Sequence, residues 1–301
     1  MRTVVALGGN ALAGPGRLGT AEEQLSRLRG VARALAPVLE RDEVVVTHGN
    51  GPQVGAMLVR HERAAAEVPP HPLHLIVAET QAELGSLIAE ALREVTARPV
   101  ACILTHVLVS EGDPAFREPT KPVGPIYGED EARALERDRG WLLAAENGHW
   151  RRIVPSPRPR EIVELAAIRG LLDGGAVAVA CGGGGIPVAR RNGRLDGIDG
   201  VIDKDRASSL LAIGVGARRL LILTDVDALY RGFGTPEAEA VRELDATAAE
   251  AMLADLPAGS MRPKLEACLE FVRATGGEAL ITSAEALDRA LAGRAGTIVL
   301  P

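Results

Sequence analysis

The sequence has 301 residues, of which 47% are apolar and only 2% aromatic, so its core must be aliphatic. A net charge of −6 argues against nucleic acid as the main partner, since binding to phosphates needs a basic face. No apolar run approaches the ~18 residues of a membrane-spanning helix, and the first apolar run is shorter than that of a signal peptide. Three widely spaced cysteines favour neither a disulfide framework nor a zinc site, so we expect a cytoplasmic protein.

Short apolar runs alternate with stretches of helical periodicity along most of the chain. The apolar runs predict buried strands at residues 3–7, 43–47, 100–109, 176–180, 219–224, 278–282 and 296–300. Helices are predicted at residues 20–41, 53–66, 75–93, 160–175, 203–216, 259–275 and 283–293. Continuous apolar strands between helices indicate an α/β fold, in which helices cover both faces of a mainly parallel sheet. Ligands bind beyond the carboxyl ends of the strands in such sheets.

Two local motifs support this assignment of elements. Thr20, with Glu23 three residues later, forms a capping-box pattern at the start of the first helix. Asn192 and Gly193 predict a tight turn within a hairpin over residues 188–195. The tract from about 112 to 158 differs, because it is rich in proline and charge, holds both tryptophans and shows little periodicity. We expect this tract to be an inserted, lid-like subdomain.

Four loops of unusual composition follow predicted strands: "GGNAL", "HGNGPQ", "GGGGIP" and "TDVDALY". Glycines let the backbone approach a ligand closely, and backbone N–H groups ahead of a helix bind anions. A single Gly-Gly after a strand is more often only a tight turn, but glycine-rich loops here follow three strands. Their spacing fits neither a P-loop nor a dinucleotide-binding motif.

Lysine is rare in this chain. Of its 34 basic Lys and Arg residues only three are lysines, namely Lys121, Lys204 and Lys264. A composition bias against lysine explains the rarity but not the positions, since each lies in a Gly- or Pro-bearing loop or at the start of a helix. Lysine and arginine are not interchangeable where a compact point charge is needed. We therefore expect at least two of the three lysines to be functional.

Acidic residues flank one of these lysines. Asp199 and Asp205 are candidates for a functional role, whereas Asp203 is better placed to cap the helix that begins beside it. The histidines show no ligand spacing, and His48, the only one in a site-like loop, is equally compatible with a structural role. Cationic side chains and backbone N–H groups without a nucleophile are typical of phosphoryl transfer without a covalent intermediate.

The sequence resembles carbamate kinase, of the amino-acid-kinase fold. The resemblance runs nearly end to end and includes "VVALGGNAL", "VVTHGNGPQVG", "DPAFREPTKPVGPIY", "ACGGGGIPV", "DGVIDKDRASSLLA", "LLILTDVDALY" and "GSMRPKLEACLEFV". It implies a three-layer sandwich with a small protruding subdomain, over residues of about 112–158. It further implies one domain over 1–301, with a carbamate-binding lobe of about 1–202 and a nucleotide-binding lobe of about 203–301.

The activity implied by the resemblance is the reversible reaction of ATP with carbamate to give ADP and carbamoyl phosphate. Mg²⁺ would be bound mainly through the ATP phosphates, in a cytoplasmic homodimer that serves arginine fermentation, with no nucleic-acid or membrane partner. The catalytic residues implied are Lys121, Lys204, Lys264, Asp199 and Asp205. The substrate-binding residues implied are Gly8, Gly9, Asn10, Gly49, Asn50 and Gly51. The nucleotide-binding residues implied are Gly182, Gly183, Thr224, Asp225, Val226, Asp227, Tyr230, Met261 and Lys264.

Two departures from the family pattern leave substrate preference and rate open. Thr80 and Ser86 replace a serine and a tyrosine of the "SQG-x-IGY" stretch, while Gln81 and Gly85 remain. Arg262 stands beside Lys264 where a small residue is common. Two alternatives therefore remain: another small-acid kinase of the same fold, or a non-catalytic sensor of nucleotide or carbamoyl phosphate.

Overall fold

The computed structural model describes residues 1–8, 19–146, 148–256 and 261–301. An eight-stranded sheet lies at its centre, in the order β15-β17-β16-β12-β1-β2-β9-β3. Neighbouring strands are parallel except for β16 and β17. The strands are β1 (Arg2–Leu7), β2 (Glu43–His48), β3 (Val100–Cys102), β9 (Val177–Val179), β12 (Arg219–Leu223), β15 (Glu243–Leu244), β16 (Glu278–Thr282) and β17 (Thr297–Val299).

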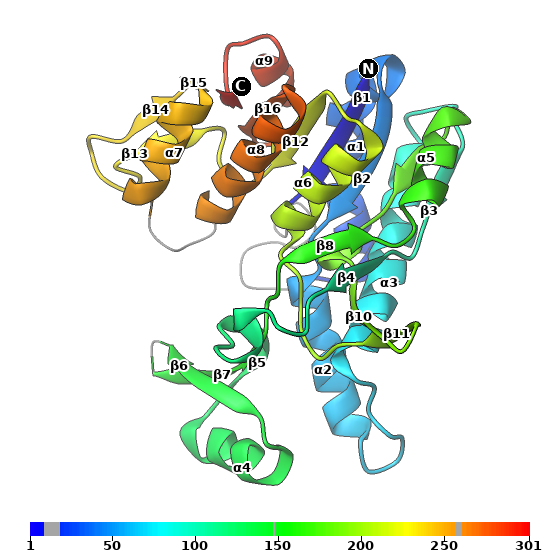
Figure 1. Ribbon diagram of the computed structural model, residues 1–301, viewed down its shortest axis with the longest axis vertical. Coiled ribbons are helices and arrows are strands. Elements are labelled where there is room, and N and C mark those ends of the chain that lie inside the picture. Colours follow the sequence, from blue (N-terminus) through cyan, green and yellow to red (C-terminus); the bar gives the residue numbers. More distant parts are fainter. Residues whose placement is uncertain (9–18, 147, 257–260) are drawn as a thin grey trace.

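Helices cover both faces of this sheet, as the apolar strands predict (Figure 1). Alternate residues of β1 serve the two faces: Val4 and Ala6 belong to one apolar core, Val5 and Leu7 to the other. The first core is closed by α5 (Leu165–Asp173), α6 (Lys204–Val215), α7 (Ala246–Asp255) and α8 (Met261–Thr275). The second core is closed by α1 (Ala21–Arg41), α3 (Leu73–Arg93) and α9 (Leu287–Leu291).

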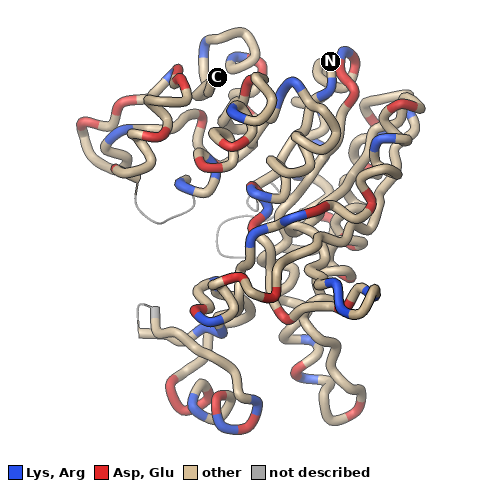
Figure 2. The backbone as a smooth tube through the Cα atoms, in the orientation of Figure 1, with Lys and Arg blue, Asp and Glu red and all other residues tan. Residues whose placement is uncertain are grey.

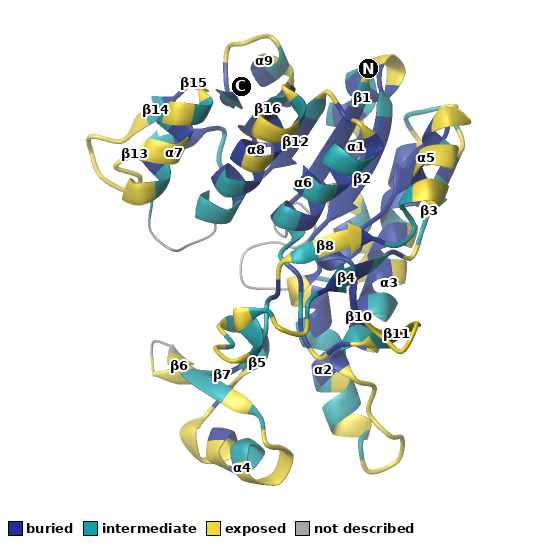
Figure 3. Ribbon diagram, in the orientation of Figure 1, coloured by how far each residue is buried: buried dark blue, intermediate teal, exposed yellow. Residues whose placement is uncertain are grey.

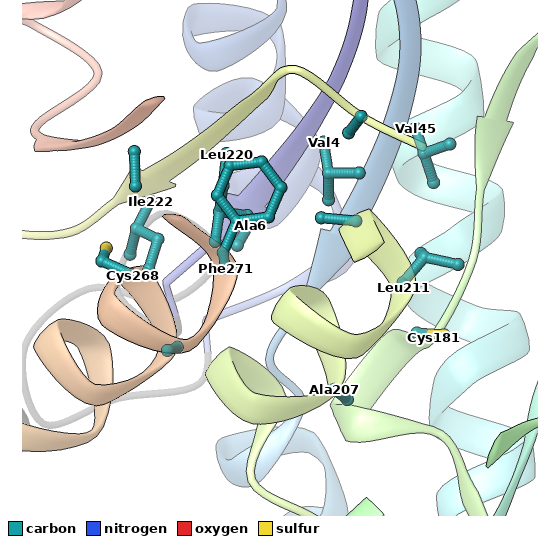
Figure 4. Packing of buried hydrophobic residues seen from close by; sticks show 14 of the residues in the cluster. Val4, Ala6, Val45, Cys181, Ala207, Leu211, Leu220, Ile222, Cys268 and Phe271 are labelled. Atoms are coloured by element: carbon teal, nitrogen blue, oxygen red, sulfur yellow. The ribbon is translucent and has the colours of Figure 1, made fainter. Parts of the chain in front are cut away.

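The core of the first face is aliphatic apart from one ring. Figure 4 shows Phe271 of α8 lying over Ala6 and Leu220 of the sheet, with Cys268 beside Ile222. Small side chains on the strand let this large ring fit fully buried. The strands of the central sheet are correspondingly the most deeply buried part of the molecule (Figure 3).

A second, four-stranded sheet lies in the order β11-β10-β4-β8. It is formed by β4 (His106–Val109), β8 (Pro159–Ile162), β10 (Ile186–Arg191) and β11 (Arg194–Gly197). Two predictions were wrong here. Residues 100–109 form two strands in different sheets, and residues 160–162 are strand rather than the start of a helix. Residues 160–162 form a strand because β8 pairs through its backbone with β4, which lies far away in sequence.

The tract expected to be an insertion forms a small subdomain apart from the main body (Figure 1). Its sheet has the order β5-β7-β6 and is antiparallel. The elements are η2 (Pro114–Phe116), β5 (Lys121–Tyr127), α4 (Glu129–Arg139), β6 (Leu142–Glu146) and β7 (His149–Val154). The fold class, including a protruding subdomain, is therefore as the sequence predicts, whereas the division into two lobes stays a prediction.

Local signals in the sequence set several element boundaries. Thr20 and Glu23 form the expected capping box at the start of α1. Asn192 and Gly193 have positive φ in the turn between β10 and β11, as the hairpin motif requires. The sequence prediction placed the start of α2 (Gly51–Ala64) two residues late, and it gave no elements within the subdomain. It also omitted α7 and three short strands, namely β13 (Leu229–Arg231), β14 (Glu239–Val241) and β15. Among the described residues, no helix is both long and apolar enough to span a membrane.

Candidate active site

A cleft of about 740 Å³ lies where the subdomain meets the main body. Several parts of the chain contribute to it, among them the starts of α2, β5, α6 and α8, strand β7 and the glycine loop after β9. The described residues that line it are Gly49, Asn50, Gly51, Pro52, Val54, Thr120, Lys121, Pro122, Val123, Arg151, Ser156, Gly183, Val201, Ile202, Asp203, Lys204, Asp205, Arg206, Arg262, Pro263, Lys264 and Glu266.

All three lysines of the chain line this one cleft. Lys121 opens β5 of the subdomain, Lys204 is the first residue of α6, and Lys264 lies in the first turn of α8. They are separated by 83 and 60 positions in the sequence, so only the tertiary fold brings them together. The prediction that the lysines belong to one site therefore has direct geometric support.

Asp205 lies between two of these lysines. Its carboxylate accepts a hydrogen bond from Nζ of Lys204 and, at 3.1 Å, one from Nζ of Lys264. Burial alone would raise the pKa of Asp205, but the two ammonium groups outweigh that effect and hold it below its usual value. Burial also lowers the pKa of Lys204, and Asp205 offsets only part of that shift. The aspartate thus keeps two cations close together in a buried place.

Asp203 has two roles at the same helix start. One carboxylate oxygen accepts hydrogen bonds from the backbone N–H groups of Asp205 and Arg206, which makes Asp203 the N-cap of α6. The other oxygen is 3.1 Å from Nζ of Lys121. The cap of α6 therefore also anchors the lysine of the subdomain over the cleft.

The glycine loops after β2 and β9 meet on one side of the cleft. A Cβ atom on Gly183 would lie 2.1 Å from Nδ2 of Asn50, so only glycine allows this approach. Nδ2 of Asn50 donates a 2.9 Å hydrogen bond to Oγ1 of Thr80, which is fully buried. Thr80, one departure from the family pattern, therefore supports a residue that lines the cleft. Ser86, the other departure, is exposed.

Gln81 and His48 hold the same loops, a role that the sequence analysis did not assign to Gln81 and left open for His48. Gln81 donates a 2.9 Å hydrogen bond to the carbonyl of Gly182 and accepts one of 2.5 Å from the N–H of Thr105. His48 is fully buried, and burial lowers its pKa to about 4, with nearby Lys204 acting in the same direction. A neutral His48 accordingly packs against Gly182, where a Cβ atom would lie 2.3 Å from Nε2.

The basic lining of the cleft extends beyond the lysines. Arg151, Arg206 and Arg262 also line it, and the rarity of lysine drew attention away from them. Glu266 pairs with Arg206 at 3.1 Å and with Arg262 at 3.5 Å. Arg262, a departure from the family pattern, is thus held by a carboxylate one helical turn away.

Several residues named from the sequence lie outside the lining of this cleft. Asp199 is 59% exposed and pairs with Arg152 at 2.8 Å, so of the two aspartates predicted to be catalytic it is Asp205 that contacts Lys204 and Lys264. Gly8 donates its N–H to the carbonyl of Leu223, which places it beside the end of β12. Gly9 and Asn10 lie outside the described residues.

The predicted nucleotide segment follows β12 at the carboxyl edge of the central sheet. Thr224 donates its N–H to the carbonyl of Thr282 at the end of β16, and Tyr230 donates its hydroxyl to Asp227 at 2.6 Å. Asp225 and Val226 lie between them in this segment, and Met261 packs against the core that contains β12. The segment and Gly8 are therefore neighbours, although the segment does not line the cleft itself.

Two glycine-to-alanine substitutions can show whether position 183 needs glycine for lack of space or only for its positive φ. Gly183 and Gly140 have nearly the same φ, +64° and +63°, but a Cβ on Gly140 would have no heavy atom within 4 Å. We expect Gly140→Ala to cost roughly 1–2 kcal/mol in the free energy of unfolding and nothing in kcat. Gly183→Ala should cost more than that and should lower kcat/KM, because Asn50 must move. If the two variants lost the same free energy of unfolding and kept the same kcat/KM, the close approach of Gly183 to Asn50 would have no role.

Comparison with known proteins agrees with this geometry. The model of the amino acid kinase family matches residues 1–283, so the chain belongs to that family. Within it, relatives that match along nearly the whole chain include carbamate kinases. Carbamate kinase of Halobacterium salinarum is 45% identical over 99% of this chain and 98% of its own, and that of Pyrococcus furiosus is 40% identical over 100% and 99%.

Solved structures show the same relationship. Carbamate kinase from Giardia lamblia bound to AMP-PNP superimposes with a TM-score of 0.93, at 38% identity over 99% of this chain and 98% of that one. The resemblance seen in the motifs is thereby confirmed, as is the amino-acid-kinase fold. An isopentenyl phosphate kinase from T. acidophilum, at 15% identity and a TM-score of 0.57, shares the fold alone.

Proposed function

We propose that the protein is a carbamate kinase, which transfers a phosphoryl group reversibly between ATP and carbamate and so forms ADP and carbamoyl phosphate. One observation carries this proposal: the three lysines of the chain, from three distant elements, line one cleft. The ATP-dependent phosphotransferases among its full-length relatives agree with it. The alternatives are another small-acid kinase of the same fold and a non-catalytic sensor of nucleotide or carbamoyl phosphate.

The lysines act through charge and position. In phosphoryl transfer, negative charge spreads over the oxygens of the transferred group, and the protein contributes positioning and electrostatic stabilisation. Lys204 and Lys264, fixed by Asp205, provide two buried ammonium groups on the side of the main body. Lys121 provides a third from the subdomain, held by Asp203 at 3.1 Å. The transferred group would then be surrounded by cations without any covalent intermediate.

Carbamate and the nucleotide would bind at the ends of neighbouring strands of the central sheet. We assign carbamate and the terminal phosphate to the loops of Gly8, Gly9, Asn10, Gly49, Asn50 and Gly51, after β1 and β2. We assign the rest of the nucleotide to Gly182 and Gly183 and to the segment Thr224, Asp225, Val226, Asp227 and Tyr230, with Met261. The hydrogen bond from Gly8 to Leu223 supports this arrangement, because it joins the two assigned regions directly.

Mg²⁺ would be bound mainly by the phosphates of the nucleotide. Asp203, Asp205 and Glu266 are the carboxylates among the described lining residues, and each is already paired with lysine or arginine. Mg²⁺ commonly combines phosphate oxygens and water with few protein ligands, so this arrangement fits the ion. When bound, Mg²⁺ would neutralise phosphate charge that the lysines do not reach.

The wider biological setting is also a proposal. Carbamate kinase activity would serve arginine metabolism in the cytoplasm, in a homodimer of one-domain subunits with lobes of about 1–202 and 203–301. Figure 2 shows acidic and basic residues interspersed along the described part of the backbone, and this mixture supports small-molecule partners over nucleic acid.

An assay of ATP formation from carbamoyl phosphate and ADP with Mg²⁺ tests the proposal. We expect turnover in the wild-type protein and a large loss in Lys264→Met, because the buried ammonium group is removed. Nucleotide binding, measured by calorimetry, should persist in the wild type and weaken in Lys264→Met, because Lys264 is also a predicted nucleotide-binding residue. Binding without turnover in the wild type would instead favour a sensor, and turnover with other acyl phosphates but not carbamoyl phosphate would favour another small-acid kinase.

A further inference from the structure

A cluster of two histidines and one glutamate lies outside the cleft, where α2 ends and α3 begins. Nε2 of His61 is 3.3 Å from one carboxylate oxygen of Glu79, and Nδ1 of His71 contacts the other oxygen. The three ligand atoms lie within 4.8 Å of one another, and the two imidazole rings are 4.9 Å apart. None of the three residues lines the cleft.

The local sequence makes this cluster stiff. His61 lies in the last turn of α2, and Glu79 lies in the second turn of α3. His71 lies in the connection between these helices, within "VPPHP", where prolines on both sides fix φ of the backbone around it. Figure 3 shows this connection as an exposed loop at the tip of the helix pair, so an ion from solvent can reach it.

The donor set is that of a transition metal ion. Two imidazole nitrogens and one carboxylate bind Zn²⁺ with a fourth position left for water, and ligands on one tetrahedral Zn²⁺ lie about 3.3 Å apart. The separation of His61 and Glu79 already has this value. His71 already contacts the other carboxylate oxygen of Glu79, and its side chain is 49% exposed, so an ion from solvent can reach it. Mg²⁺ prefers oxygen ligands, so the ion that serves the nucleotide would not compete strongly here.

Binding of Zn²⁺ requires a change of tautomer at His61. Nε2 faces a carboxylate oxygen of Glu79 at 3.3 Å and Nδ1 faces the backbone N–H of His71 at 3.5 Å, so the proton lies on Nε2 in the metal-free protein. The ion would displace that proton to Nδ1 and so break only the contact with His71, which is at the outer limit for a hydrogen bond. The spacing of the three residues fits no sequence motif, which is why the sequence predicted no metal site from its histidines.

We propose that His61, His71 and Glu79 bind a single Zn²⁺ ion, which joins the end of α2 to the start of α3. Both helices also support the cleft. Thr80, the neighbour of Glu79, holds Asn50, and Glu62, the neighbour of His61, accepts a 3.0 Å hydrogen bond from Tyr127 of the subdomain. The ion would therefore stabilise the frame on which the cleft is built without contacting substrate.

Calorimetric titration of ZnCl₂ into the full-length, chelator-treated protein without nucleotide tests this proposal. We expect one bound equivalent in the wild type and a rise in the thermal midpoint with Zn²⁺, since a ligand that binds only the folded state stabilises it. His71→Gln and Glu79→Gln should each lose that equivalent and that rise. With Co²⁺ in place of Zn²⁺, the wild type should show visible d–d absorption and the variants should lack it.

His149→Gln is the matched control, because His149 is an exposed histidine of the subdomain away from the cluster. It should keep the full equivalent of Zn²⁺. Circular dichroism of each variant without metal shows whether the protein has folded. Absence of Zn²⁺ binding in the wild type, or equal binding in His71→Gln and His149→Gln, overturns the proposal and leaves Glu79 as a hydrogen-bond partner of two histidines.

Discussion

Lys121→Arg should lower kcat by about 10²-fold, the loss that removal of one stabilising donor causes in other enzymes. Lys121 lines the cleft from the subdomain, and its Nζ lies 3.1 Å from the carboxylate of the N-cap Asp203. Arginine keeps the positive charge but replaces a compact ammonium group by a longer, planar guanidinium. That group cannot occupy the same point over the transferred phosphoryl group. Steady-state assay of ATP formation measures the effect.

The same substitution should leave folding intact. The side chain of Lys121 is 43% exposed, and an ion pair of this kind contributes at most about 1 kcal/mol to the free energy of unfolding. Arg137→Lys, on the exposed side of α4 in the same subdomain, is the matched control and should keep normal turnover. If Lys121→Arg were as active as that control, lysine at this position would reflect composition alone.

Much of the site was visible in the sequence because its signals are local. Glycine-rich loops mark strand ends whatever the rest of the chain does, and an N-cap such as Asp203 is specified by the helix that follows it. The three lysines stood out through the contrast with arginine, which is a property of composition. These signals pointed to several residues that line the cleft, among them the three lysines, while their convergence in one cleft needed the structure.

The remaining features depend on contacts between distant residues. Strand β8 is decided by pairing with β4 rather than by its own residues, whose pattern is equally helical. Thr80 and Gln81 read as part of a helix face, and only packing shows that they hold Asn50 and Gly182. The basic residue Arg151 is one of many arginines in the sequence, so nothing local distinguishes it as a lining residue.

Asp205→Asn should abolish turnover and lower the free energy of unfolding by about 3–5 kcal/mol. The aspartate is 3% exposed and contacts two lysines, so asparagine of the same size would leave two cations without their shared counter-ion. Burial already lowers the pKa of Lys204, and loss of Asp205 should lower it further. Urea denaturation at neutral pH, where Asp205 is ionised, measures the change.

Asp199→Asn is the control variant for both turnover and the free energy of unfolding. Its carboxylate is 59% exposed and pairs with Arg152, so its loss should change stability by no more than about 1 kcal/mol. Turnover of this variant decides which aspartate organises the lysines. A loss as large as that of Asp205→Asn would give Asp199 a catalytic role that its position outside the cleft lining does not explain.

The double variant Asp205→Asn/Lys204→Met then tests the physical cause. Methionine has nearly the length of lysine without its charge, so removal of one stranded cation should restore part of the lost stability. The double variant should stay inactive, because it lacks the ammonium group of Lys204 that would stabilise the transferred phosphoryl group. Stability that falls further in the double variant would mean that Asp205 acts through hydrogen bonds or packing rather than by balancing the charge of Lys204.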